Sequence, residues 1–169
     1  MDTLRSRTVR LAYANPLLRP HLLPLLRVGK SAGPVYLGVF FPSNAMSALH
    51  AWWEEEVGTP LFLDLANDPH VTLKFKPSMD EILAQPIGKS MKVTILGWAE
   101  DDKIQTVVVD TPTANPVSHI TLATAPGVPA AYSKSLLQHG YTHVRGPTLL
   151  GVLGYSDGKQ IQFKAPQSA

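Results

Sequence analysis

The chain has 169 residues, of which 44% are hydrophobic and 17% are charged, and this composition is that of one globular domain able to bury a core. It contains no cysteine, which excludes disulfides, thiol nucleophiles, iron–sulfur clusters and cysteine-ligated zinc. The formal net charge is only +2, which argues against a protein that coats long nucleic acids, so any nucleic-acid partner is expected to be small or a chain end.

Residues 1–34 are predicted to form an arm distinct from the rest of the chain. The arm is basic near its start, at Arg5, Arg7 and Arg10. Prolines interrupt it at positions 16, 20, 24 and 34. The prolines exclude one continuous helix, but a short helix over residues 3–14 is expected. The segment VRLAYANPLLRPHLLPLLR resembles a leader of phage-encoded proteins; the alternative is a surface arm whose leucines pack on the domain.

Neither a membrane span nor a secretory signal is predicted. No apolar run reaches the roughly 18 residues that a spanning helix needs, and the first residues lack an apolar signal core. We therefore expect no membrane partner and a cytoplasmic location, which would be the host cytoplasm for a phage-encoded protein.

A regular domain is predicted over residues 35–169. It begins with the β-branched and aromatic run VYLGVFF at residues 35–41, which indicates a strand buried on both faces. Pro42 ends this strand, and Ser43 is expected to cap a helix over residues 44–57 whose leucine and tryptophans face the core. Gly58 is expected to end that helix.

The remaining elements are short strands with few helices between them. Strands are predicted at residues 61–65, 70–76 and 118–124, a helical or loop segment at residues 80–83, and a helix at residues 132–140. Two hairpins are predicted, one from residues 89–101 and 103–111 and the other from residues 149–155 and 159–163. Because strands outnumber helices and no linker divides this region, the fold class is predicted to be α+β.

Two of the strands repeat one pattern of polar residues. PHVTLKF at residues 69–75 and SHITLAT at residues 118–124 share the order histidine, β-branched apolar residue, threonine, leucine. Alternate residues of a strand project from the same face, so each histidine is expected to share a face with its threonine. These pairs are His70 with Thr72 and His119 with Thr121. The intervening residues are expected to hold both strands in the core, and they are Val71, Leu73, Ile120 and Leu122.

Two such strands side by side would present two imidazoles and two hydroxyls to one cleft, which suits hydrolysis or cyclic transfer at phosphorus. One neutral imidazole can take a proton from the attacking water while the other, protonated, donates one to the leaving sugar oxygen. The threonine hydroxyls can donate hydrogen bonds to the non-bridging phosphate oxygens. Two histidines without a third ligand make a poor catalytic zinc site. We therefore expect neither a metal nor another cofactor.

With these motifs the chain resembles the two-histidine phosphoesterase superfamily, which is defined by a pair of His-x-Thr/Ser motifs on strands. The text HVTLKF…SHITLATAPGVPAAYSKSLL is most similar to the cyclic phosphodiesterase domain of plant tRNA ligases, and the resemblance runs from Val35 to Phe163. It implies a two-lobed, pseudo-symmetric α+β fold with antiparallel sheets around a central cleft. The two motifs lie closer together in sequence than in many relatives, and a trimmed lobe would leave a more open cleft.

The resemblance also implies an activity, namely the opening of 2′,3′-cyclic phosphates, typically to 2′-phosphates. It implies that His119 is the general base and His70 the general acid, although the residues themselves leave both assignments open.

Five further residues are candidates for contacts with the substrate, and they are Lys74, Tyr132, Ser133, Tyr36 and Phe40. The lysine continues, by parity, the polar face of the first motif, where it either contacts a phosphate or protects a strand edge from aggregation. The tyrosine and serine follow the second motif, in a loop that lies near the cleft in the resembled superfamily. The last two share a face of the first strand, where they either meet a base or pack in the core.

The sequence thus predicts a metal-independent phosphodiesterase for a nucleotide or RNA terminus that bears a 2′,3′-cyclic phosphate. A second hypothesis, which the phage-like leader encourages, is hydrolysis of a cyclic nucleotide or oligonucleotide signal in host defence. A third is a non-catalytic module that binds RNA ends. The presence of two histidines and two threonines argues against the third, because a binding module needs no pair of proton-transfer groups. No obligate protein partner is indicated.

Overall fold

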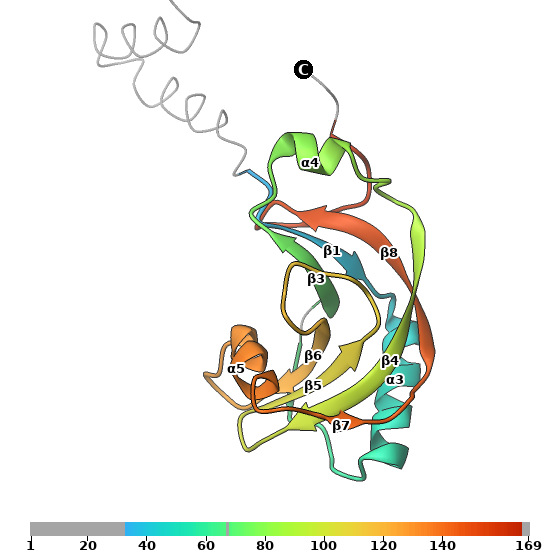
Figure 1. The fold of residues 1–169 in the computed structure, drawn as a ribbon, viewed down its shortest axis with the longest axis vertical. Coiled ribbons are helices and arrows are strands. Elements are labelled where there is room, and N and C mark those ends of the chain that lie inside the picture. The colour runs from blue at the N-terminus through green and yellow to red at the C-terminus, as the bar shows by residue number, and fades with distance from the viewer. Residues whose placement is uncertain (1–32, 67, 167–169) are drawn as a thin grey trace, which may run out of the picture. The chain divides into compact units, whose positions relative to one another are not determined.

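The computed structural model describes residues 33–66 and 68–166. The chain divides into two units, Met1–Gly33 and Pro34–Ala169. The helix predicted over residues 3–14 lies outside the described residues. The elements described below belong to the second unit, which is an α+β domain with a large antiparallel sheet and few helices (Figure 1). The predicted fold class is confirmed at this level.

Nine strands in the described part of the chain form one antiparallel sheet. They are β1 (Tyr36–Phe40), β2 (Asp64–Leu65), β3 (His70–Phe75), β4 (Ser90–Glu100), β5 (Ile104–Val109), β6 (His119–Thr124), β7 (Thr142–His143), β8 (Thr148–Ser156) and β9 (Ile161–Gln162). Their order is β2-β6-β5-β4-β8-β1-β3, while β7 pairs with β4 and β9 pairs with β8. The predicted hairpins are confirmed as the pairs β4/β5 and β8/β9.

The long strand β4 joins the two halves of the sheet because it changes partner along its length. Its first residues, from Ser90 to Thr94, pair with β8, and its later residues, from Ile95 onward, pair with β5. The register shifts between Ile95 and Gly97, and such an irregularity bends a strand. Gly97 is required because a Cβ atom would collide with the carbonyl oxygen of Thr142. In the curled sheet β3 contacts β6, although the two strands lie far apart in the strand order (Figure 1).

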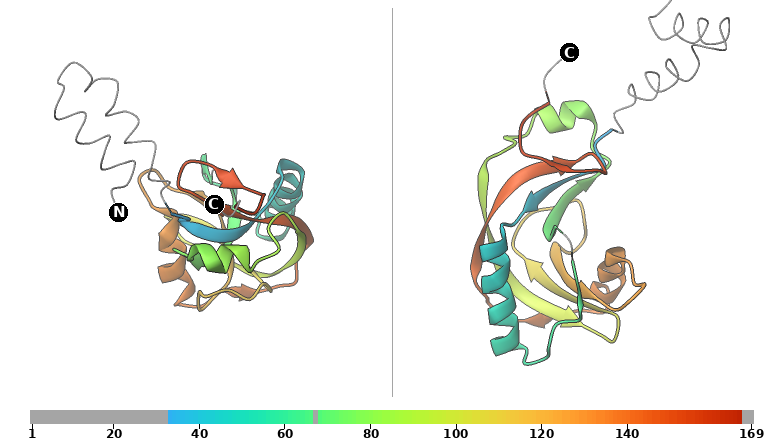
Figure 2. Two further views of the ribbon diagram at one scale, coloured as in Figure 1. Left: turned by 90° about the horizontal axis from the view of Figure 1, so that it is seen from above. Right: turned by 180° about the vertical axis from the view of Figure 1, so that it is seen from behind.

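Helix α3 (Ser43–Glu56) lies beside β8 (Figure 2). Leu49 and Trp53 are fully buried, as predicted for its apolar face. The predicted N-cap is wrong by one residue, because Pro42 occupies the N-cap position and Ser43 is already helical. Proline suits this junction since its ring fixes φ near the value that a helix start needs.

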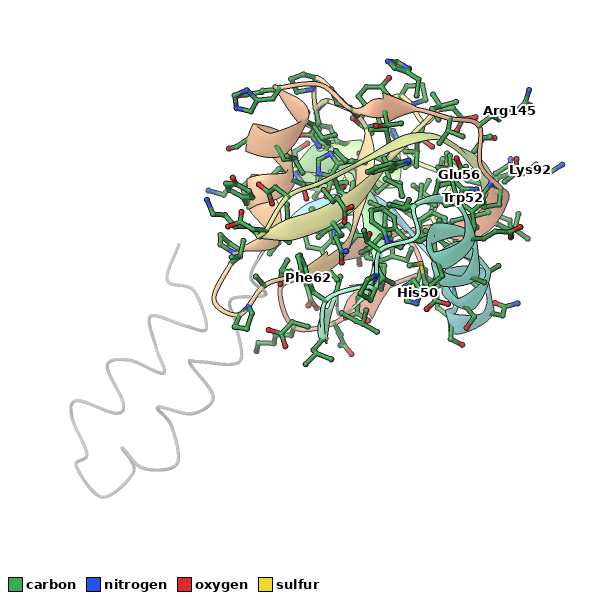
Figure 3. The ribbon with its side chains drawn as sticks, turned by 90° about the horizontal axis from the view of Figure 1, so that it is seen from below. His50, Trp52, Glu56, Phe62, Lys92 and Arg145 are labelled. Carbon is green, nitrogen blue, oxygen red and sulfur yellow. The ribbon has the colours of Figure 1, made fainter. Side chains whose placement is uncertain are left out.

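The side of α3 that carries Trp52 packs against the segment that precedes β8. Figure 3 labels Trp52 and Glu56 on the helix and Arg145 in that segment. A Cβ atom at Gly146 would lie 2.9 Å from the indole ring of Trp52, so only glycine allows the ring this close. The helix is thereby held against the same long strand, β8, that pairs with β1 and β4.

The other described helices are short, and they are α4 (Met79–Leu83), the 3₁₀ helix η2 (Ala130–Tyr132) and α5 (Ser133–Leu137). Helix α4 begins with a capping box, in which Ser78 and Glu81 each satisfy a backbone N–H of the other. Gly140 has a φ of 105°, which closes the α5 region as its sequence position predicts.

The strand predicted over residues 61–65 is mostly wrong, since only Asp64 and Leu65 form β2. The buried side chain of Gln105 explains the difference. Its Oε1 accepts a hydrogen bond from the backbone N–H of Phe62 (2.8 Å), and its Nε2 donates one to the carbonyl oxygen of Pro60 (2.9 Å). These bonds satisfy the backbone groups that a strand would have used in its ladder.

The apolar residues of the two histidine motifs lie in the core, as predicted. Val71, Ile120 and Leu122 are fully buried, and Leu73 is partly buried against the same cluster. Strands β3 and β6 are therefore anchored from behind, and their other faces carry the histidines and threonines.

Candidate active site

Both histidines and both threonines of the motifs line one cavity of about 420 Å³, which lies where β3 meets β6. The other lining residues come from β1, β3, η2, the start of α5 and loops, and they are Tyr36, Ala66, Asp68, Pro69, Phe75, Asn115, Ala130, Ala131 and Lys134. A cavity of this size, with mostly apolar walls and a few convergent polar groups, is typical of a small-molecule site.

The two imidazoles are held by equivalent hydrogen bonds. His70 Nδ1 lies 2.8 Å from the carbonyl oxygen of Asp68, and His119 Nδ1 lies 2.9 Å from the carbonyl oxygen of Val117. A carbonyl oxygen can only accept, so Nδ1 carries the proton and donates in both rings. In the neutral form, each Nε2 therefore keeps its lone pair and is the nitrogen available for proton transfer.

Burial lowers the pKa of both imidazoles below the ordinary value, because desolvation disfavours the charged ring. The hydrogen bond to the Asp68 carbonyl and the charge of the Asp68 carboxylate both raise the pKa of His70, whereas nearby His119 lowers it. For His119, the bond to Val117 raises the pKa and the positive charge of Lys134 lowers it. Both rings are therefore neutral near neutral pH, and an anion in the cavity would favour the return of one proton.

Aromatic rings fix the orientation of His70. The Tyr36 ring stacks on the imidazole with a centroid distance of 4.5 Å and an interplanar angle of 14°, and the Phe40 ring lies 5.3 Å away. Gly38 lies between these two residues on β1, and a Cβ atom there would come within 2.8 Å of the carbonyl oxygen of Val71. Tyr36 also lines the cavity, whereas Phe40 does not.

Ser133 supports Thr121 from behind. Its side chain is fully buried, and its Oγ lies 2.8 Å from Thr121 Oγ1. Ser133 does not line the cavity, so its hydroxyl reaches the site only through its hydrogen bond with Thr121. In the loop between β5 and β6, Asn115 lines the cavity, and its Nδ2 donates a hydrogen bond to the backbone carbonyl of Thr72 at 3.4 Å.

The prediction that Lys74 continues the face of His70 and Thr72 is wrong, because the register of β3 is irregular. Thr72 pairs with Gly38, but Lys74 pairs with Leu37, the next residue of β1. The extra residue between them reverses the alternation of the strand beyond it. Lys74 consequently points away from the cavity and forms an ion pair with Glu81 at the start of α4.

Tyr132 lies in the predicted loop, but its side chain does not line the cavity. Its hydroxyl donates a hydrogen bond to Asp101 Oδ2 at 3.0 Å, and the ammonium group of Lys103 lies 5.3 Å from the centre of its ring. The tyrosine therefore ties η2 to the β4/β5 turn.

Of the lining residues that the sequence did not single out, Phe75 brings an aromatic ring, Asn115 an amide, Lys134 a positive charge and Asp68 a carboxylate. Phe75 pairs with Tyr36 across β1 and β3 and is 59% exposed, so its ring is available at the mouth of the site. Lys134 follows Ser133 directly and brings a positive charge close to His119. Only Phe75 left a signal in the sequence, as the aromatic residue that closes the first motif.

The comparisons with known proteins give no family. No model of a protein family matches the chain, and no curated protein matches it significantly.

In residues 33–66 and 68–166, no three histidine, cysteine, aspartate or glutamate side chains are grouped as metal ligands. Within the same ranges, no helix has the length and apolar character needed to cross a membrane.

Proposed function

We propose that the protein is a phosphodiesterase that hydrolyses 2′,3′-cyclic phosphates on nucleotides or RNA ends by histidine acid–base catalysis. The observation that carries this proposal is the shared cavity, in which two imidazoles with the same Nδ1–H to carbonyl bond lie beside two threonines. A pair of imidazoles held in one tautomer is the arrangement that in-line proton transfer to and from a phosphate ester needs. The two-lobed, pseudo-symmetric fold of the two-histidine phosphoesterases is part of this proposal.

The neighbouring charges support distinct roles for the two histidines. Lys134 opposes a second positive charge on His119, which favours the neutral ring that a general base requires. The Asp68 carboxylate favours the charged form of His70, which a general acid requires. These roles, His119 as base and His70 as acid, are those that the resemblance implies.

In the proposed reaction, His119 Nε2 takes a proton from water as the water oxygen bonds to phosphorus. The bond between phosphorus and the sugar 3′-oxygen breaks, and His70 Nε2 gives its proton to that oxygen. The product is a 2′-phosphate with a free 3′-hydroxyl, and the two histidines exchange protonation states. No electron is transferred, and solvent returns the protons.

The remaining polar groups stabilise negative charge on the phosphate. The hydroxyls of Thr72 and Thr121 donate to the two non-bridging oxygens, and Ser133 fixes the direction of the Thr121 hydroxyl. Lys134 adds a positive charge on the same side. Such preorganised donors act most strongly on charge that grows in the transition state.

The test is to incubate the purified protein, with EDTA present, with 2′,3′-cyclic mononucleotides, 2′,3′-cyclic RNA ends, 3′,5′-cyclic nucleotides and cyclic oligonucleotides. Products are identified by ³¹P NMR and chromatography. We expect turnover of the 2′,3′-cyclic compounds to 2′-phosphates, and loss of that turnover in His70→Ala. The matched control is His139→Ala, since His139 is exposed and lies outside the cavity. Turnover confined to 3′,5′-cyclic or cyclic oligonucleotides would replace the proposed substrate class, and binding without turnover would indicate a non-catalytic module.

A further inference from the structure

A second cavity, of about 360 Å³, adjoins the candidate active site and has no role in the mechanism above. Its walls are apolar, formed by Phe40, Phe41, Val152 and Ile161, with Phe163 at the rim. The turn made by Asp68 and Pro69 lines both cavities. The two are therefore neighbours that one extended ligand can occupy together.

Phe40 connects the second cavity to the catalytic histidine. Its ring lies 5.3 Å from the His70 ring, and 5.8 Å from the ring of Phe163, which it meets edge to face at 89°. Phe40 is almost fully buried, whereas Phe163 is 44% exposed. One aromatic ring is thus fixed as a wall, and the other presents open ring surface next to it.

The Phe163 ring packs against the backbone of Gly154, which has no side chain. A Cβ atom at Gly154 of β8 would lie 2.9 Å from this ring, so glycine allows the ring to lie against the strand. Strand β9, which directly precedes Phe163, pairs with β8 and fixes the position of the ring's backbone. The cavity is therefore built on paired strands, which keep its aromatic walls in place.

The charges around the two cavities indicate which part of a ligand each cavity would bind. Among the described residues that line the second cavity, Asp68 is the only ionisable one, so this cavity offers a phosphate no positively charged partner. Lys134 and the polar motif residues belong to the first cavity. An occupant of the second cavity is therefore an uncharged, flat apolar group, attached to a phosphate ester that stays in the first. A nucleobase has these properties, because every base offers a π face that stacks on aromatic side chains.

We propose that this second cavity binds the base of the penultimate nucleotide, which precedes the terminal nucleoside that carries the cyclic phosphate. The cavity is lined by Phe40, Phe41, Val152, Ile161 and Phe163. The terminal nucleoside occupies the first cavity, whose volume and aromatic walls, Tyr36 and Phe75, are sufficient for it. The preferred substrate is then an oligonucleotide end, and a mononucleotide leaves the second cavity empty. This inference rests on the proposed phosphodiesterase function.

The experiment compares a dinucleotide that ends in a 2′,3′-cyclic phosphate with the 2′,3′-cyclic mononucleotide of the same terminal base. For the wild-type protein we expect kcat/KM to be about 5- to 100-fold higher for the dinucleotide, the range that stacking of one base on aromatic rings gives. Phe163→Ala should lower kcat/KM for the dinucleotide toward that of the mononucleotide and leave the mononucleotide value unchanged. Phe163→Tyr, which keeps the ring, should restore the preference.

A second variant fills the cavity and does not depend on removing an aromatic ring. Val152→Phe places additional volume in the cavity and should abolish the preference for the dinucleotide. Equal kcat/KM for both substrates in the wild-type protein, or a preference that survives both Phe163→Ala and Val152→Phe, would overturn the second cavity as a base site while leaving the proposed function intact. Absence of turnover of both substrates would instead contradict the proposed function, and the inference with it.

Discussion

Strands β3 and β6 carry the same motif and hold their histidines by the same hydrogen bond, yet the surroundings of the two rings differ. His70 packs against the rings of Tyr36 and Phe40 and lies close to the carboxylate of Asp68. His119 lies close to the positive charge of Lys134, on a strand whose Thr121 is bonded to buried Ser133. Two imidazoles with the same hydrogen bond are thus placed in unequal electrostatic environments, as the proposed acid and base roles require. That is how one histidine can serve as an acid while its counterpart serves as a base.

The largest expected effect is that of removing either histidine. His70→Ala and His119→Ala should each lower kcat by about 100-fold or more, since each removes one general acid–base group. The double variant should be little worse than either single variant, because the two residues act as a unit. Steady-state kinetics with a melting curve for each variant checks this. Near wild-type turnover in a folded histidine variant would remove that histidine from the mechanism.

The threonines should show the next largest effect, and here the two strands should differ. Thr72→Ala and Thr121→Ala each lose a hydrogen bond to a charged phosphate, which corresponds to about a 10- to 150-fold loss in kcat/KM. Ser133→Ala should lower kcat/KM by about 5-fold in the wild-type background, because Thr121 loses one neutral hydrogen bond that orients it.

The Ser133 effect should vanish in the Thr121→Ala background and persist in the Thr72→Ala background. That double-variant comparison is the measurement, and equal losses in both backgrounds would contradict a role for Ser133 through Thr121.

Lys134→Gln should change the pH profile on one side only. Loss of the positive charge raises the pKa of His119, so the acidic limb of kcat/KM, where the base becomes protonated, should move to higher pH. The maximal kcat/KM should fall by about 10-fold through the lost phosphate contact. Lys134→Arg should restore both, and Lys103→Gln, outside the cavity, serves as the matched control. Movement of the alkaline limb instead would assign Lys134 to the other histidine.

Asp68→Asn should have the smallest effect and should act on the opposite limb. Without the carboxylate the pKa of His70 falls, so the alkaline limb, where the acid loses its proton, should move to lower pH. Asparagine is the suitable replacement because the backbone of Asp68 has a φ of 49°, which asparagine tolerates. The backbone carbonyl that orients His70 is retained. An unchanged alkaline limb would show that the carboxylate does not tune His70.

The sequence allowed the two motif strands to be predicted well, because their signal is local. Alternation within β3 and β6 is enough to bury Val71 and Ile120 and to place each histidine on the same face as its threonine. The hairpins were equally accessible, since turn residues separate runs of β-prone residues. The contact of β3 with β6 arises from the bend of β4 and from the order of the strands, which local patterning does not encode.

The predictions that were wrong concern places where a single residue altered the regular strand pattern. An extra residue in the β3 register sends Lys74 to α4 and places Phe75 at the cavity, and parity alone cannot reveal such a shift. Gln105 replaces strand pairing around Phe62 by side-chain bonds from a distant strand. Lys134 reaches the site only because η2 contacts β6 and α5 packs against β4 and β5, so its position depends on tertiary structure rather than on any spacing in the sequence.

The pH dependence of kcat/KM for a 2′,3′-cyclic phosphate, measured with EDTA present, tests most directly whether the two histidines act as an acid–base pair. We expect a bell-shaped profile, because one imidazole must be neutral and the other charged in the same complex. His119 sets the acidic limb, because the base must be neutral. We expect the midpoint of this limb to lie below the ordinary pKa of histidine, since burial lowers the pKa of His119. A profile without two limbs, or activity that EDTA abolishes and a divalent metal restores, would contradict the mechanism.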